Sequence, residues 1–324
     1  MFRKAVAALA VGITLLALSG CATAAAPGAG ASAKAGGLIS VIVNDPSNPF
    51  WTAEGDAVAT EAKKLGYTSK ISAHKGDTKL ESDLIDTAIT NKSVAVILDP
   101  ANADGSIGAV KKLVAAKIPV FLVNAEINQE KLAKSQLVSN NAQGAALGAT
   151  EWVKSIGSSG TYVELLGAPS DNNAATRSNG YKTVISQYPN IKLVGQEVGN
   201  WDQKQGYDKM QSLLAAHPDI TGVIAGNDSM ALGAIAALKQ AGKLETVKVG
   251  GFDGSPDAAA AVTAGTMQYT VLQPVVKFAS EAVIQADSFI RTGKTGVATE
   301  KQSFDCVLIN KANVAKYTSF GLSE

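Results

Sequence analysis

The chain has 324 residues, an almost even balance of 29 basic and 28 acidic side chains, two cysteines and two histidines. No long run of one charge sign is present, so neither nucleic acid nor an anionic membrane surface is expected to bind by charge. His74 and His217 are far apart in sequence, and neither has a second ligand at metal-binding spacing. We therefore expect no metal, no cofactor and no catalytic triad.

The first residues are typical of an export signal followed by a lipid anchor. A short basic region precedes an apolar run over 5–18, which is too short to span a membrane. The next residues, Leu18-Ser19-Gly20-Cys21, resemble the bacterial lipoprotein cleavage box. We expect 1–21 to hold the signal and box, with Cys21 acylated and tethering the exported chain to the outer face of the cytoplasmic membrane. The alternative is an ordinary signal peptide cut near 22–24.

Residues 22–37 are mostly Ala, Gly, Ser and Pro, a composition that predicts a flexible linker. Beyond it, short β-branched runs alternate with segments of helical periodicity. The runs cover 38–43, 94–98, 119–123, 161–166, 191–198, 221–225, 247–250 and 267–272. The helical segments include 51–65, 80–91, 107–116, 142–156, 175–188, 203–216 and 230–241. This alternation predicts an α/β fold in which parallel sheets carry helices on both faces.

The number of predicted strands is too large for one sheet of this kind, so we expect two doubly wound lobes. The N-terminal lobe should comprise 38–139 plus 274–302, and the C-terminal lobe 140–273 plus 303–324. Several segments would then cross between the lobes and form a multi-strand hinge. Such a hinge lets two lobes close on a ligand that binds in the cleft between them.

Short polar side chains directly follow several predicted strands. Asn227 and Asp253 each follow an apolar run, which brings an amide and a carboxylate to the carboxyl edge of one sheet. Asn124 and Gln273 end two further strands in the same way. Amide and carboxylate groups can hydrogen-bond to neighbouring hydroxyl groups, so the pattern favours a sugar-type ligand. For each residue alone, the alternative is a cap on the following helix or turn.

Aromatic side chains accompany these polar groups. Ser47-Asn48-Pro49-Phe50-Trp51 comes directly after the first predicted strand, and Trp201 follows a later one. Aromatic rings suit the C–H faces of sugars, while the Asn48 amide can donate and accept hydrogen bonds. The alternative is that Phe50 and Trp51 begin the core face of the first helix.

Together these residues resemble the periplasmic pentose-binding proteins of ABC importers, the group that contains the ribose- and xylose-binding proteins. The resemblance covers nearly everything from about Leu38 to the end of the chain. It implies two lobes that close on a ligand, an importer permease as partner, and no enzymatic activity; we also expect a monomer. The ligand contacts that it implies are Asn48, Phe50, Trp51, Trp201, Asn227, Asp253 and Gln273.

Departures from the ribose-binding pattern bear on the ligand. Asn124-Ala125 stands where that group has an Asp-Arg pair, and Ala175 stands where it has a further arginine, so two bidentate donors are lost. Instead, the loop at 170–174 is similar to the one by which xylose-binding proteins hold their sugar. On this basis Asp171 and Asn173 are added as contacts, and Asn124, which ends its strand, completes the expected set.

The resulting set is rich in amides, with two carboxylates and three aromatic rings. An anionic ligand would be left unpaired there at a cost of several kcal/mol. A neutral pentose or pentitol, such as xylose, ribose or xylitol, is therefore expected. We expect Arg177 to act as a structural anchor, although it or Glu126 could also touch the ligand. Two alternatives stay open: a sugar sensor for a chemotaxis or signalling partner, and an α/β sugar-modifying enzyme.

Two other motifs are interpreted as structural. Asp99-Pro100-Ala101-Asn102-Ala103-Asp104 has the oxygen spacing of a calcium loop, but the glycine at the turn is missing and Val110 replaces the bidentate acid. We expect a helix-capping loop. Gly293-Lys294-Thr295 ends like a phosphate loop, yet no strand precedes it, so a helix terminus is predicted.

Overall fold

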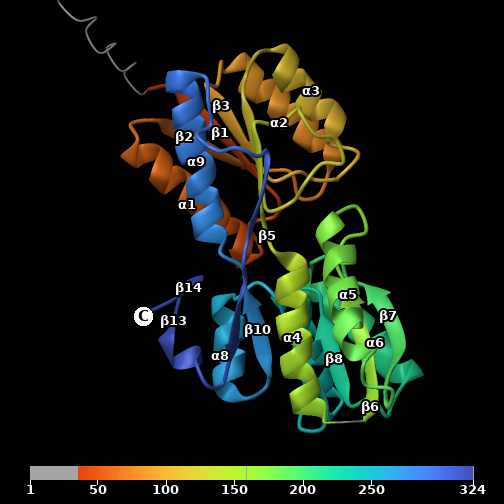
Figure 1. Cartoon of the computed structure of the whole chain (residues 1–324). Helices are drawn as coiled ribbons and strands as arrows, with labels where there is room; N and C mark the ends of the chain where they lie inside the picture. Colours follow the sequence, from red (N-terminus) through yellow and green to blue (C-terminus); the bar gives the residue numbers. More distant parts are fainter. Residues whose placement is uncertain (1–35, 158, 324) are drawn as a thin grey trace, which may run out of the picture. The chain divides into compact units, whose positions relative to one another are not determined.

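The computed structural model describes residues 36–157 and 159–323, and this part of the chain contains two six-stranded sheets (Figure 1). The first sheet consists of β1 (Leu38–Val43), β2 (Thr68–Ala73), β3 (Ala95–Leu98), β4 (Val120–Val123), β5 (Ser135–Ser139) and β11 (Lys301–Phe304). These strands lie in the order β11-β5-β4-β3-β1-β2, and every neighbouring pair is parallel.

The second sheet consists of β6 (Gly160–Leu166), β7 (Ile191–Val198), β8 (Gly222–Ala225), β9 (Lys248–Gly250), β10 (Tyr269–Leu272) and β12 (Val307–Asn310). Its order is β12-β10-β9-β8-β6-β7, parallel throughout except that β12 runs antiparallel to β10. Beyond β12 lie a short 3₁₀ helix, η1 (Val314–Lys316), and a small sheet of β13 (Tyr317–Thr318) and β14 (Gly321–Leu322). The predicted α/β class with parallel sheets is confirmed.

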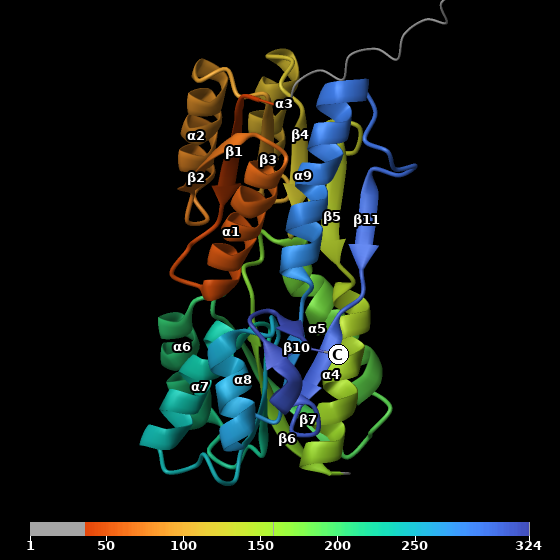
Figure 2. The ribbon, with the colours of Figure 1, turned by 90° about the vertical axis from the view of Figure 1, so that its left-hand side faces the viewer.

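Helices cover both faces of each sheet (Figures 1 and 2). The first sheet carries α1 (Pro49–Lys64) and α9 (Val275–Thr292) on one face and α2 (Thr78–Thr90) and α3 (Ile107–Ala115) on the other. The second carries α4 (Asn141–Ile156) and α5 (Asn172–Ile185) on one face and α6 (Gln203–Ala216), α7 (Asp228–Gln240) and α8 (Pro256–Ala264) on the other. Among the described residues, no helix combines the length and the apolar character needed to cross a membrane.

Three strands of the first sheet escaped prediction, each because polar residues mask it. β2 is an edge strand whose residues are mostly exposed or half-buried, so it lacks an apolar run. β5 begins with Ser135 and Gln136, which are fully buried but hydrogen-bonded to Gln285 and Glu300. β11 is likewise polar and sits at the other edge. Polar residues that find buried partners leave no sign in the hydrophobic pattern.

The chain passes between the two sheets three times within the described residues. The passages lie between β5 and α4, between β10 and α9, and between β11 and β12. We call the first sheet with α1, α2, α3 and α9 the N-terminal lobe, and the second sheet with α4 to α8 the C-terminal lobe. The lobe limits given above stay a prediction.

Helices α6 and α7 touch through glycine, and both begin beside predicted site residues. A Cβ added to Gly233 on α7 would lie 2.2 Å from the carbonyl oxygen of Gln203 and 2.7 Å from the backbone nitrogen of Tyr207 on α6. A Cβ on Gly206 of α6 would lie 2.6 Å from Cα of Met230. Since backbone atoms cannot give way as a flexible side chain can, only glycine fits at this approach.

We expect Gly233→Ala to lower the free energy of unfolding by about 1–3 kcal/mol, because the two helices must separate to admit a methyl group. Urea unfolding followed by circular dichroism measures the change. Gly108→Ala on α3 is the matched control, since a Cβ there would meet nothing within 4 Å. The control should leave stability unchanged or slightly raise it. Equal effects of the two substitutions would show that α6 and α7 are not held at this distance.

Candidate ligand-binding site

The ten side chains that we expected to contact ligand line one small cavity. The N-terminal lobe supplies residues from the start of α1 and from the end of β4, and the C-terminal lobe supplies the others. The eleven lining residues are Asn48, Phe50, Trp51, Asn124, Asp171, Asn173, Arg177, Trp201, Asn227, Asp253 and Gln273. Their contact with a ligand stays a prediction.

Three of these residues also cap helices, so the capping alternative is correct for them. Asn48 is the N-cap of α1, and its side chain accepts from the backbone N–H of Phe50. Asp171 caps α5 in the same way by accepting from Asn173. Asn227 caps α7 by accepting from Met230. Capping and lining the cavity are therefore compatible. Each cap also brings the positive end of a helix dipole to the cavity, which favours nearby carboxylates and electron-rich oxygens.

Three other lining residues have backbone conformations that L-amino acids rarely adopt. The φ angles of Asn124, Trp201 and Asp253 are 61°, 65° and 134°. Asparagine tolerates the left-handed region, whereas tryptophan and aspartate at these angles are held there by their surroundings. Strain of this kind concentrates at functional sites, where it fixes the direction of a side chain. The fold therefore maintains strained backbone conformations at residues that line this cavity.

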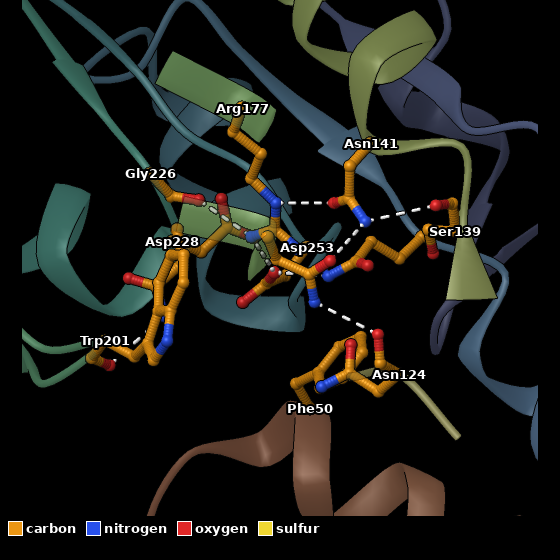
Figure 3. Close-up of polar contacts among 12 residues, drawn as sticks. Phe50, Asn124, Ser139, Asn141, Arg177, Trp201, Gly226, Asp228 and Asp253 are labelled. Atoms are coloured by element: carbon orange, nitrogen blue, oxygen red, sulfur yellow. Dashed lines mark hydrogen bonds and ion pairs between the residues drawn. The ribbon is translucent and has the colours of Figure 1, made fainter. Parts of the chain in front are cut away.

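Arg177 on α5 lies at the centre of the polar network (Figure 3). Its Nε donates to Oδ1 of Asn141 at 2.7 Å, and an Nη donates to the carbonyl oxygen of Gly226 at 2.8 Å. The guanidinium stacks on the ring of Phe252, with its carbon 3.9 Å from the centroid, and lies 3.6 Å from Oδ1 of Asp253. These contacts are those of the anchor that we expected. Arg177 also lines the cavity, whereas Glu126 pairs with Lys301 and is not a lining residue.

Asp253 follows β9 and is only 3% exposed. Burial is the main cause that raises the pKa of its carboxyl to about 8, and the neighbouring Arg177 opposes the rise. Nε2 of Gln273 donates to Oδ1 of Asp253 at 2.8 Å. The adjacent Asp228 is satisfied elsewhere, since it accepts from the backbone of Ser255 and from the hydroxyl of Thr270. Asp253 is thus the carboxylate of this pair that lines the cavity.

Sequence reasoning missed Asp99, which follows β3 and is hydrogen-bonded to two residues that line the cavity. Oδ2 of Asp99 accepts the indole N–H of Trp51 at 2.7 Å and the amide of Asn124 at 2.9 Å. The surrounding loop does not cap α3 as expected, because the N-cap residue Ser106 makes no capping side-chain hydrogen bond. Asn102 instead accepts from the backbone N–H groups of Asp104 and Gly105 within the loop. The sequence does carry a signal, since Asp99 follows an apolar strand as Asn124 and Asp253 do, but the oxygen-rich loop that begins at Asp99 suggests a different role.

Glu54 on α1 is a second buried carboxyl in this region, and it is fully inaccessible to solvent. Neither carboxyl oxygen has a hydrogen-bond partner among the described residues. Burial and, second, the charge of Asp99 raise the pKa of Glu54 well above its ordinary value. The folded chain therefore holds this proton more tightly than the unfolded chain does. The resulting stabilisation is complete below about pH 4.3 and is lost as the pH rises through the raised pKa.

We expect Glu54→Met to raise the free energy of unfolding by about 1–3 kcal/mol at pH 8, because it removes a buried carboxyl without partners, and to raise it less at pH 5. Chemical unfolding at both pH values measures the difference. Asp56→Met is the control on the same helix, since Asp56 is exposed. A gain from Glu54→Met that is equal at both pH values, or a loss at pH 8, would show that Glu54 is not held protonated.

Comparisons with known proteins agree with this arrangement. Residues 39–295 match the family described as periplasmic binding protein domain. A D-apiose import binding protein of Actinobacillus succinogenes is 47% identical over 289 residues, which are 89% of this chain and 93% of that protein. A second, from Paraburkholderia graminis, is 48% identical over 291 residues, 90% of this chain and 93% of the relative. The ribose import binding protein RbsB of Escherichia coli is 29% identical over 264 residues, 82% and 88% of the two chains.

Solved structures show the same two-lobed fold. An ABC transporter periplasmic solute binding protein from Actinobacillus succinogenes with bound D-allose superposes with a TM-score of 0.80 and 26% identity. That superposition covers 87% of this chain and 100% of the other. The resemblance that the motifs suggested is therefore confirmed. The chain belongs to the periplasmic binding proteins, exported solute receptors that are not enzymes, together with the apiose and ribose import binding proteins.

Proposed function

We propose that the chain is the solute receptor of a carbohydrate ABC importer and that its ligand is a neutral pentose or pentitol. The relatives that share 47% and 48% of their residues with it are D-apiose import binding proteins, so D-apiose joins xylose, ribose and xylitol as a candidate. The ligand would bind between the lobes and stabilise their closed arrangement through contacts with both.

The observation that carries this proposal is the chemistry of the cavity lining. Amide groups, two carboxylates and three aromatic rings surround the space, and Arg177, the one cation among the described residues that line it, already faces Asp253. Hydroxyl groups can satisfy every one of the polar groups, and the rings can cover apolar C–H faces. A phosphate or carboxylate ligand would instead meet Asp171 and Asp253 with no uncommitted cation in the lining.

Isothermal titration calorimetry tests the proposal. D-apiose, D-xylose, D-ribose, xylitol and L-arabinose are titrated separately, with ribose 5-phosphate and an amino acid mixture as comparisons. We expect one or more of the neutral compounds to bind with one site per chain. Heat from the phosphorylated sugar or the amino acids alone would refute a neutral ligand. Product formation during the titration would favour the sugar-modifying enzyme instead.

We also propose that Cys21 carries a lipid that anchors a monomeric receptor to the membrane beside its permease. This position lies outside the described residues, so support comes from Leu18-Ser19-Gly20-Cys21 alone. Membrane fractionation of cells that express the full chain tests the anchor. Wild type should sediment with membranes and Cys21→Ser should not. If both distribute equally, the anchor is refuted while the binding proposal stands.

A further inference from the structure

Two amide side chains at the cavity are oriented by carboxylates. Nδ2 of Asn124 donates to Asp99, and Nε2 of Gln273 donates to Asp253. The other end of each amide, Oδ1 of Asn124 and Oε1 of Gln273, is buried and has no hydrogen-bond partner in the described part of the chain. Both residues line the cavity. A buried carbonyl oxygen without a partner is costly, so each site is completed when a ligand supplies a donor.

Gln273 and Asp253 belong to the set of contacts already expected, but Asp99 does not. Asp99 is 1% exposed; it lines a larger neighbouring cavity together with Trp51 and Asn124, but it is not one of the eleven residues that line the small cavity. It acts on the cavity through two neighbours from different elements, Trp51 on α1 and Asn124 after β4. One carboxylate oxygen thus fixes both the plane of an indole ring and the direction of an amide.

Within the buried pair of Asp99 and Glu54, hydrogen bonding favours the charged form of Asp99. The titratable groups nearest to it are Glu54 on α1, Glu81 on α2, His74 after β2, and Asp171 on the other lobe. Burial raises the pKa of both Glu54 and Asp99, but only Asp99 receives N–H donors, from Trp51 and Asn124. Hydrogen bonds to a carboxylate favour ionisation, so the proton of this buried pair belongs on Glu54.

From this geometry we propose that Asp99 is a positioning residue that determines ligand specificity. It holds the amide nitrogen of Asn124 and the indole N–H of Trp51. As a result, Oδ1 of Asn124 faces the cavity as an acceptor that one ligand hydroxyl must satisfy. The inference rests on the proposed function, since it assigns a donor to the same ligand. Without Asp99, the amide of Asn124 can rotate and offer either its oxygen or its nitrogen. The site then loses both affinity and the ability to reject a ligand that lacks this hydroxyl.

The binding test uses three variants of the full chain and the tightest of D-apiose, D-xylose, D-ribose and xylitol. Asp99→Leu removes the acceptor, and we expect it to weaken binding about 10- to 100-fold. Asp99→Asn keeps an acceptor oxygen of the same shape, so it should recover most of the loss. Glu164→Met is the matched control. Glu164 is also buried and accepts from Ser178 and Gln196, but it does not line the cavity, so its loss should leave the Kd unchanged.

Specificity is read with monodeoxy derivatives of the same sugar. For wild type, one deoxy derivative should bind at least about 10-fold more weakly than the parent sugar. For Asp99→Leu, the same derivative should bind almost as well as the parent sugar, because the variant no longer requires that hydroxyl. A merely structural role for Asp99 would weaken all the sugars by the same factor. Equal Kd values for wild type and Asp99→Leu, or the same ranking of the deoxy sugars in both, would overturn the proposal.

Indole ¹H–¹⁵N spectra test the inference without any ligand. The Trp51 resonance, identified with Trp51→Phe, should lie downfield and move upfield in Asp99→Leu, because its carboxylate partner is gone. Trp152, whose buried indole N–H has no partner among the described residues, is the internal reference. If no sugar binds wild type, the proposed function fails, and the chemical shift of Trp51 alone tests the positioning role of Asp99. A Trp51 signal that does not move in Asp99→Leu overturns that role. If Asp99→Leu does not fold, the same shift in Asp99→Asn, smaller in size, replaces it.

Discussion

Replacing Arg177 by methionine should lower the free energy of unfolding by about 3–5 kcal/mol, the range found when one partner of a buried ion pair is removed. The substitution leaves Asp253 buried beside an apolar side chain. It also removes the donors to Asn141 and to the carbonyl oxygen of Gly226. The stacking on Phe252 is lost as well. Urea unfolding monitored by fluorescence measures the change.

Arg291→Met is the matched control for this prediction, because the same substitution is made at an arginine near the surface. Arg291 pairs with Asp287 one turn away on α9, and its side chain is 25% exposed. This pair lies within one helix and is partly exposed, so we expect its loss to cost less than the loss of the buried pair. Arg177→Lys should not restore stability, since an ammonium group cannot serve three acceptors in the geometry of the guanidinium plane. If Arg177→Met were no more destabilising than the control, Arg177 would not be the anchor of the C-terminal lobe.

The second large effect is expected on ligand affinity. Asp253→Asn should weaken sugar binding about 10- to 100-fold at pH 9, where a carboxyl with a pKa of about 8 is ionised, because hydrogen bonds from hydroxyls to a charged acceptor contribute about 1.5–3 kcal/mol each. The amide retains the size of the carboxyl, so the cavity should keep its shape. Titration calorimetry with the tightest sugar measures the loss. Asp219→Asn, at an exposed position after α6, is the control and should bind as wild type does. Unchanged affinity in Asp253→Asn would remove this carboxylate from the site.

Polar residues that directly follow apolar strands are the part of the site that the sequence predicts best. In a parallel sheet the carboxyl ends of the strands meet at one edge, so Asn124 and Asp253 were placed correctly from the apolar runs that precede them. The same rule applied to Asp99 would have found it, but the neighbouring oxygen-rich loop suggested another role. Glu54 could not be found, because a buried acid on a helix face looks like an exposed one in sequence.

Contacts between distant segments were also beyond the sequence pattern. Phe320, in the segment between β13 and β14, packs edge-on against Phe50 with ring centroids 6.1 Å apart. Tyr317 donates its hydroxyl to the carbonyl oxygen of Gly254, next to Asp253. The end of the chain thus touches a cavity residue of one lobe and the neighbour of a cavity residue of the other. Such pairings depend on tertiary packing, which no local periodicity encodes.

A crystal structure with the tightest-binding sugar tests the central claim most directly. We predict one sugar in the cavity, with hydroxyl oxygens within about 3.2 Å of Asp253 or Gln273 in the C-terminal lobe and of Asn48 or Asn124 in the N-terminal lobe. Sugar bound at another place, or held by side chains of a single lobe with Asn124 and Asp253 turned away, would contradict it.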